Sequence, residues 1–253
     1  MQDNETIHPF SLLNHEYEKW IVGNINKLDE NRARFCSTNA VRFLRCANAV
    51  FKTYPMVSSF CALNATEEAV AAFISAAKVH GHKVYASTVN LHDHRSKALI
   101  SVFAQQCIDN IEPENLAISL HQESDHLFFH VPERNDGHGR ELHLSSFSID
   151  PSNGVFLLDD IPLGDVPSLE KLDAAAEEVA ETRNKILYAT DKGFPIGFVK
   201  LEASIAREIK LSLGLIWATV DMYMHPDQNR PFVEDVLEAI ALVCKEKKNK
   251  KKS

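Results

Sequence analysis

The amino-acid sequence predicts a mostly helical protein, an antiparallel helical bundle with a small inserted antiparallel β-sheet. Two observations lead to this fold class. Apolar residues recur at three- and four-residue spacing through the first hundred residues and again after residue 168, which is the period of an amphipathic helix. Between these stretches, from Leu116 onward, apolar residues alternate with small or polar ones, which is the period of a strand.

Breaks in the helical pattern divide the chain into elements. We expect helices at about 14–28, 31–53, 55–80, 91–110, 168–189, 200–224 and 231–246. Pro55 and Pro231 suit first helical turns, and Ser168 can cap the helix that follows it. Gly81 suits the position just after a helix end. The boundaries are therefore marked by residues with a physical preference for those positions.

The sheet is expected from three stretches of alternating residues. LAISLHQESDHLFFHV (116–131) predicts a hairpin with its turn at QESD, and RELHLSSFSI (140–149) and GVFLLDDI (154–161) predict further strands. We expect one sheet of three or four strands, with the loop at 132–140 as its most mobile part. The predicted organisation is a first bundle part at 1–114, the insertion at 115–163, a second bundle part at 164–246 and a basic disordered tail at 247–253.

Composition and charge restrict the class of protein. The 253 residues are 45% hydrophobic and 25% charged, as in ordinary soluble domains. The chain starts without a secretion-signal pattern and has no eighteen-residue apolar run, so we expect a cytoplasmic protein. Its five cysteines lack CxxC spacing and predict reduced core thiols. The net charge is −8, although the stretch 245–252 alone carries +5, so most of the surface should repel nucleic acid.

One glutamate pair stands out in the apolar helix predicted at 55–80. Glu67 occupies a slot in the apolar stripe, whereas Glu68 lies about one hundred degrees round the helix. A buried carboxylate costs several kcal/mol unless it is paired, so Glu67 should meet a basic group from a neighbouring helix. The candidates are His94, Arg95 and Lys97 in LHDHRSKAL (91–99), with Arg42 and Arg45 as further candidates.

A metal centre at this pair is the less favoured interpretation. In a simple antiparallel hairpin at about 1.5 Å per residue, Glu67 would lie about 20 Å from the turn and His94 about 5 Å from it. The two side chains would then miss each other by about three turns, unless the loop at 81–90 changes the register. We therefore predict no metal and no cofactor, and a structural ion pair remains an alternative to a functional one.

The order of these motifs resembles a known family. A long helix (NAVRFLRCANAVFKTYP), a second helix with the Glu67-Glu68 pair and a helix that starts H-x-x-K are similar to the AbiV branch of the HEPN superfamily, helical bundles associated with abortive infection. The similarity covers about residues 31–110. Glu67 and Glu68 match the acidic half of the E-E-x-x-K motif, and His94 and Lys97 match H-x-x-K. Ala71 replaces the motif's lysine, and the R-x4-6-H motif of ribonuclease members is absent.

The resemblance implies a cytoplasmic, homodimeric anti-phage effector that acts on RNA or the translation machinery. If the protein is a metal-independent ribonuclease, His94 and Arg95 would form the acid-base and phosphate-contacting pair, with Glu67 and Lys97 orienting them. The alternative is a non-enzymatic interaction module that presents the sheet and the loop at 132–140 to a partner protein.

Other polar residues are weaker candidates for a site. His121, His126 and His130 could assemble a three-histidine metal site, but a polar sheet face is the plainer interpretation. Asp221 lies within an apolar helix and should pair with Arg207 or with a lysine. The sequence contains no GxxxxGK[ST], GxGxxG, GxSxG or HExxH motif, so the nucleotide-binding, hydrolase and protease classes defined by them have no support.

Overall fold

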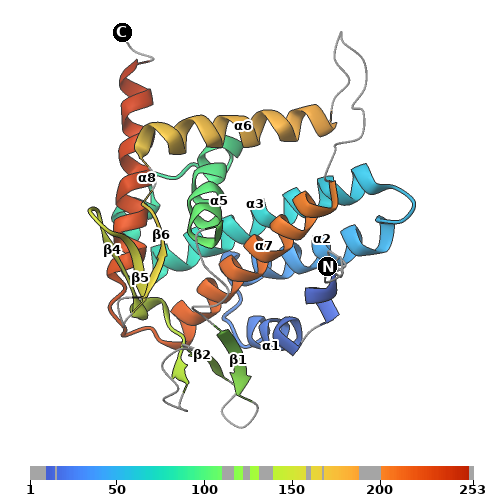
Figure 1. The fold of residues 1–253 in the computed structure, drawn as a ribbon, viewed down its shortest axis with the longest axis horizontal. Helices are drawn as coiled ribbons and strands as arrows, with labels where there is room; N and C mark the ends of the chain where they lie inside the picture. The colour runs from blue at the N-terminus through green and yellow to red at the C-terminus, as the bar shows by residue number, and fades with distance from the viewer. Residues whose placement is uncertain are drawn as a thin grey trace, which may run out of the picture.

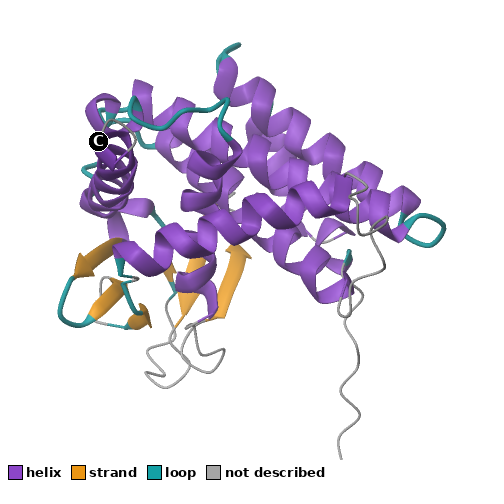
Figure 2. Cartoon of the chain, turned by 90° about the horizontal axis from the view of Figure 1, so that it is seen from above, coloured by secondary structure: helices purple, strands orange, loops and turns teal. Residues whose placement is uncertain are grey.

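The computed structural model describes residues 10–14, 16–109, 117–121, 126–130, 139–157, 161–166, 168–187 and 201–250. Helices dominate this part of the chain, and short strands occupy one side (Figures 1 and 2). The predicted fold class is confirmed. The helical elements are η1 (Ser11–Asn14), α1 (Glu16–Ile25), α2 (Arg32–Val50), α3 (Pro55–Val79), α4 (Lys83–Ala86), α5 (His94–Asp109), α6 (Leu169–Leu187), α7 (Leu201–Met224) and α8 (Pro231–Lys250).

Helix α3 is the centre of the bundle. It is buried on nearly every side, and many of its buried residues are alanines, including Ala62, Ala65, Ala69 and Ala72. Small side chains let neighbouring helices approach closely, and α2 and α7 pack along α3 (Figure 1). A helix that is apolar all round belongs in the interior. A carboxylate in the middle of α3 is therefore held among packed helices.

The strands form two sheets instead of the single sheet predicted. The first contains β1 (Ala117–His121), β2 (His126–His130) and β3 (Arg140–Glu141), and the second contains β4 (Phe147–Asp150), β5 (Gly154–Leu157) and β6 (Pro162–Gly164). All of the strand pairs are antiparallel. The stretch at 140–149 is not one strand, because a 3-10 turn over Leu144–Ser146 interrupts it. The N–H of Leu144 donates to the Asp221 carboxylate on α7, at 3.1 Å, instead of pairing with another strand.

The predicted helix ends are largely confirmed. Pro55 and Pro231 start α3 and α8, and the N–H of Lys171 lies 3.4 Å from the Ser168 hydroxyl before α6. Gly81 has a φ of +95°, a conformation that favours glycine after a helix. Helix α8 continues to Lys250 instead of ending at 246, because lysine has a high helix propensity, so residues 247–250 of the predicted disordered tail are helical.

Three further expectations have mixed outcomes. The mobile loop predicted at 132–140 falls mainly on residues 131–138, which lie outside the described residues. The five cysteines are reduced, as predicted, and Cys61, Cys107 and Cys244 pack against the core, but Cys46 is exposed and the other four are half-buried instead of fully buried. Within the described ranges, every helix is too short or too polar to cross a lipid bilayer.

Candidate functional site

The centre of the candidate site is the Glu67 carboxylate on α3, which meets side chains from two other helices. Nδ1 of His94 lies 2.7 Å from Oε1 and 2.8 Å from Oε2. Nζ of Lys97 donates to Oε2 at 2.6 Å, and Nε of Arg183 on α6 lies 2.9 Å from Oε1. The expectation that Glu67 finds a basic partner on an adjacent helix is confirmed. We call these four residues the Glu67 centre.

The contact between Glu67 and His94 corrects the spacing expected from a simple hairpin. Helices α3 and α5 are joined by residues 80–93, which include the short helix α4 and several turns. This connection carries the chain back along α3, so that α5 begins beside the middle of α3. The predicted gap of three turns is wrong, because these residues form a folded segment instead of a tight turn.

The first turn of α5 is held in place by Asp93. Its carboxylate accepts hydrogen bonds from the Ser96 hydroxyl at 2.6 Å, from the Ser96 N–H at 3.2 Å and from the Arg95 N–H at 3.3 Å. Burial raises the pKa of Asp93, but these hydrogen bonds outweigh burial and leave its pKa below the usual value. Asp93 thus caps the helix that presents His94 and Lys97.

The hydrogen bond to Glu67 fixes the tautomer of the His94 ring. A carboxylate can only accept, so Nδ1 must carry the proton, and Nε2 of the neutral ring then has a free lone pair. Among the described residues, no side chain binds Nε2, and 43% of the His94 side chain is exposed. The arrangement is an imidazole oriented by a carboxylate, with its basic nitrogen accessible to solvent, which is the geometry required of a general base.

The expected pairing of His94 with Arg95 does not form. Arg95 points toward α6, where it makes an ion pair with Asp173. Of the two further candidates, Arg42 is exposed and Arg45 pairs with Glu18 at 2.8 Å. The arginine at Glu67 is Arg183, which the sequence analysis missed. Nothing in its local pattern distinguishes it, since only the packing of α6 over α3 and α5 brings it near.

A second buried carboxylate lies beside this centre. Glu208 on α7 is 4% exposed and accepts from the Thr66 hydroxyl at 2.7 Å and from Nη2 of Arg207 at 3.0 Å. The predicted pairing of Arg207 with Asp221 is therefore wrong. Glu208 was missed because its neighbours in the sequence form an ordinary amphipathic helix.

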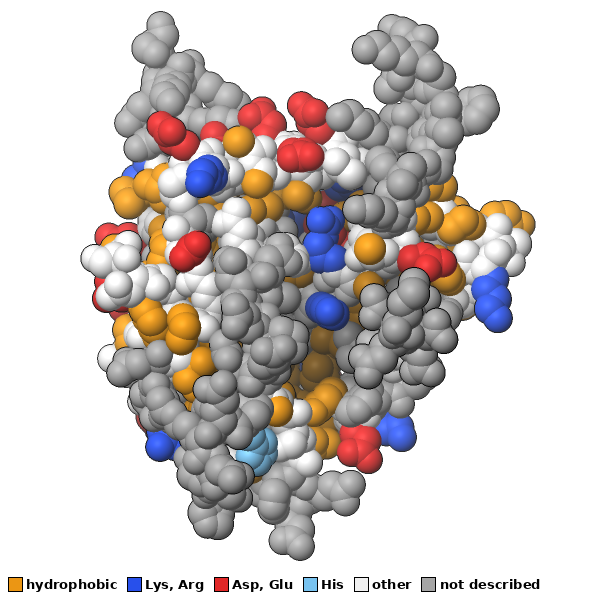
Figure 3. Space-filling model, in the orientation of Figure 1, with side chains coloured by type: hydrophobic (Ala, Val, Ile, Leu, Met, Phe, Trp, Pro, Cys, Tyr) orange, Lys and Arg blue, Asp and Glu red, His pale blue; other side chains and the backbone are white. Residues whose placement is uncertain are grey.

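The space around the two carboxylates consists of two adjoining hollows. A cavity of about 20 Å³, lined by Glu67, His94, Lys97, Arg183 and Glu208, has room for about one water molecule. A groove of about 290 Å³ adjoins it and is lined by Gln105, Thr182, Arg207 and Glu208, among others. Figure 3 shows Lys and Arg side chains in the middle of one face, below the acidic side chains at the top, where α6 lies. A large substrate would have to bind along this outer surface.

A second polar cluster lies where the first sheet meets α7. A three-histidine site of His121, His126 and His130 is the less favoured prediction, and the described side chains of His126 and His130 have other partners. Nε2 of His130 instead lies 2.8 Å from the Ser119 hydroxyl, and His126 contacts Glu141. The side chain of His121 lies outside the described residues.

Asp221 belongs to this second cluster. Its Oδ1 lies 3.2 Å from Nδ1 of His143, and Nε2 of the same ring lies 3.3 Å from Oε2 of Glu141. The hydrogen bond to Asp221 raises the pKa of His143, burial opposes it, and the negative charges of Asp221 and Glu141 add to the rise. The His143 ring therefore links two acidic side chains, Glu141 and Asp221.

Comparison of the chain with protein-family models, with curated proteins and with solved structures found no match. The similarity to the AbiV branch therefore stays a prediction that depends on the motifs around Glu67 and His94.

Proposed function

We propose that this protein is an AbiV-like anti-phage effector that cleaves RNA, with Nε2 of His94 as the general base. The observation that carries the proposal is the contact of His94 Nδ1 with both oxygens of Glu67, at 2.7 and 2.8 Å, which leaves Nε2 basic and exposed. The H-x-x-K spacing supports it as well, because it places Lys97 on the same carboxylate.

The proposed reaction is an internal transfer at a phosphodiester. Nε2 of His94 takes the proton from a ribose 2′-hydroxyl, and that oxygen attacks the adjacent phosphorus. The bond from phosphorus to the 5′ oxygen breaks, and this oxygen receives a proton from solvent. The products are a 2′,3′-cyclic phosphate and a 5′-hydroxyl, so no bond to an external water forms in this step.

Lys97 and Arg183 supply the positive charge that such a reaction needs. Negative charge grows on the phosphate oxygens as the attacking oxygen approaches, and nearby cations stabilise it. Glu67 occupies only part of the donor capacity of the two side chains, since a lysine has three N–H donors and an arginine five. The excess of cations over acids at the Glu67 centre favours an anionic substrate.

The biological setting follows from the resemblance alone. It predicts a cytoplasmic homodimer whose target is RNA or a component of the translation machinery. Light scattering of the purified full chain tests the dimer independently of activity.

A second candidate function rests on the small size of the inner cavity. Because the hollow beside Glu67 holds about one water molecule, the four-residue network could serve only to fix α3, α5 and α6 in register. The protein would then be an interaction module that binds a partner protein through its surface.

The experiment that separates these functions is an RNA cleavage assay with matched histidine variants. Total RNA or tRNA is incubated with the wild type, H94A and H92A, in chelator and in Mg²⁺, and the RNA ends are analysed. His92 is an exposed neighbour outside the Glu67 centre, so H92A is the control. Cleavage to 2′,3′-cyclic phosphate ends by wild type and H92A, but not by folded H94A, supports the enzyme. No cleavage by the wild type, or equal cleavage by H94A, rejects it.

A further inference from the structure

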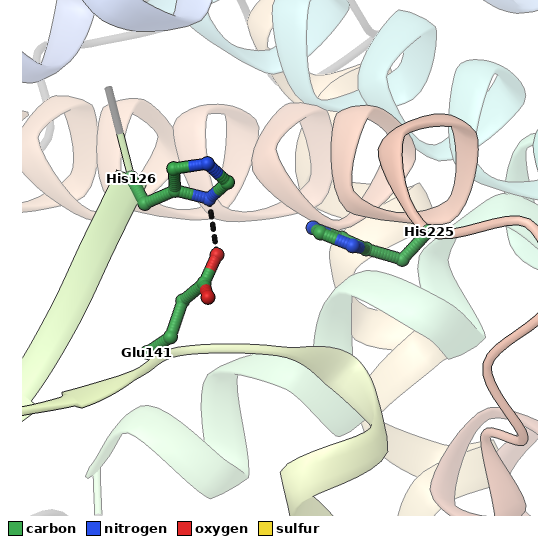
Figure 4. Close-up of side chains that lie close together, drawn as sticks. All are labelled: His126, Glu141 and His225. Atoms are coloured by element: carbon green, nitrogen blue, oxygen red, sulfur yellow. Dashed lines mark ion pairs between the residues drawn. The ribbon is translucent and has the colours of Figure 1, made fainter. Parts of the chain in front are cut away.

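Three side chains from separate elements meet at the edge of the first sheet (Figure 4). His126 begins β2, Glu141 ends β3 and His225 follows the last residue of α7. Each offers one ligand atom, and these atoms lie within 4.8 Å of one another. Nδ1 of His126 faces Oε1 of Glu141, and the His225 ring points toward the same space. Helix α7 is far from both strands in sequence, so the fold itself brings His225 to this group.

Two further residues support the carboxylate of this group. Nε2 of His143 lies 3.3 Å from Oε2 of Glu141, and Nδ1 of the same ring lies 3.2 Å from Oδ1 of Asp221. The side chain of Asp221 is only 3% exposed, and its Oδ2 accepts from the Leu144 N–H. Metal ligands in proteins are commonly oriented by such an outer shell.

The backbone that carries His225 is also fixed. Arg230 is 1% exposed and donates to the carbonyls of Met222, at 3.3 Å, of Gln228, at 2.9 Å, and of His225. These bonds tie the end of α7 to the turn that follows it. A buried guanidinium thus holds the turn from which His225 projects.

The charges of this group differ from those at Glu67. Within the described residues, the hydrogen-bond and ion-pair partners of the Glu141 and Asp221 side chains are histidines and one backbone N–H. Arg230 acts on Asp221 only through its electric field. When the imidazoles are neutral, the Glu141 and Asp221 carboxylates, which contact opposite sides of the His143 ring, therefore lack a directly bound cation. A divalent ion would supply that charge and would use the imidazole nitrogens as ligands.

We propose that His126, Glu141 and His225 bind a divalent transition metal of the zinc class, with His143 and Asp221 as the shell that orients Glu141. Two imidazole nitrogens and one carboxylate oxygen suit Zn²⁺ and its neighbours better than Mg²⁺ or Ca²⁺, which prefer oxygen ligands. Three protein ligands leave a coordination position open for water or a small anion. About a fifth to a third of each ligand side chain is exposed, so an ion can enter from solvent. This site does not depend on the activity proposed for the Glu67 centre.

The test is Zn²⁺ binding by the full chain, free of any affinity tag and stripped with a chelator. Isothermal titration and metal analysis should give one zinc per chain. Glu141→Gln and His126→Ala should each weaken binding by more than the roughly 10–100-fold typical of an outer-shell loss, and Asp221→Asn by about that amount. His130→Ala is the matched control, because His130 lies on the same strand face and pairs with Ser119. It should bind zinc like the wild type.

Two measurements keep the result interpretable. Circular dichroism establishes that each variant is folded. Co²⁺ replaces Zn²⁺ in a parallel titration, because a site of nitrogen and oxygen ligands lacks the sulfur-to-cobalt absorption that cysteine ligands would give. No zinc uptake by the wild type, equal uptake by folded Glu141→Gln and His126→Ala, or a sulfur-to-cobalt band would each overturn the proposal.

Discussion

Two partly buried acidic clusters in this protein are neutralised in different ways. Glu67 is surrounded by Lys97, Arg183 and His94, so two of its three partners are a lysine and an arginine. Glu141 and Asp221 contact histidines, whose charge depends on pH and on bound metal. A carboxylate inside the fold does not by itself define a metal site. The groups around it decide whether it orients a base or binds an ion.

The largest expected effect is on stability at the Glu67 centre. Glu67→Gln removes the charge that Lys97 and Arg183 share, and leaves both cations 12–15% exposed without an acid. Breaking such a pair should lower the free energy of unfolding by about 3 kcal/mol. Urea unfolding of the variant measures this loss.

The adjacent Glu68 provides the matched control for that experiment. Glu68 is half-buried beside Cys36 on α2. The pKa of the Cys36 thiol is raised to about 11, mainly by burial and to a smaller extent by the negative charge of Glu68. Glu68→Gln should cost less than about 1 kcal/mol. If Glu67→Gln and Glu68→Gln lowered the free energy of unfolding by similar amounts, the claim that Glu67 holds an ion-pair network and Glu68 does not would be contradicted.

Zinc should stabilise one cluster and leave the other unaffected. At a concentration one hundred times the dissociation constant, a ligand that binds only the folded state adds about 2.7 kcal/mol. For a chain of this length, the melting temperature should rise by about 5–10 °C. The rise should persist in His94→Ala and vanish in Glu141→Gln. A rise that survives in Glu141→Gln would place the ion elsewhere.

A smaller effect is expected at the cap of α5. Asp93→Ala removes three hydrogen bonds from the first turn, and should lower the free energy of unfolding by about 1 kcal/mol. Asp93→Asn keeps an oxygen that can accept from the same N–H groups, and should retain most of the stability. Thermal unfolding measures the stability of both variants. If both lose the same stability, the negative charge of Asp93 and not its hydrogen bonds stabilises the start of α5.

The smallest effect expected is a pH dependence confined to the histidine cluster. In chelator-treated protein the pKa of His143 is raised above its value in the unfolded chain, first by the hydrogen bond to Asp221. The stabilisation of the folded state by protonated His143 is thus complete below about pH 6.5. It is lost as the pH rises through the pKa of His143 in the folded state. The stability difference between the wild type and His143→Gln should therefore shrink from pH 6 to pH 9. A constant difference would contradict this assignment.

The sequence predicted one cluster well and the other poorly, for a physical reason. Helical periodicity placed Glu67 on an inward face, and the basic stretch at the start of the next predicted helix identified His94 and Lys97 as candidate partners. Local spacing carries that information. His126, Glu141 and His225 meet only because the first sheet packs against the end of α7, and Arg183 reaches Glu67 only because α6 covers α3 and α5. No local pattern reports such tertiary contacts.

The division of the strands shows the same limit. The alternation at 140–149 predicted one strand, but Leu144 bonds to Asp221, seventy-seven residues later, and the chain turns there. A single buried acid on a distant helix thus overrides the local strand preference. Asp221 also contacts His143. The residue that ends the predicted strand is therefore also part of the second polar cluster.

The most direct test of the account is the protonation state of the His94 ring. Two-bond nitrogen–proton NMR correlation on the ¹⁵N-labelled protein reports which imidazole nitrogen carries the proton, and His94→Gln assigns the signal among the twelve histidines. The account predicts the Nδ1–H tautomer for the neutral ring, with a shift of this signal alone among the histidines when Glu67 becomes Gln. An Nε2–H tautomer, or a His94 signal unchanged by that substitution, would contradict the claim that Glu67 orients a free base.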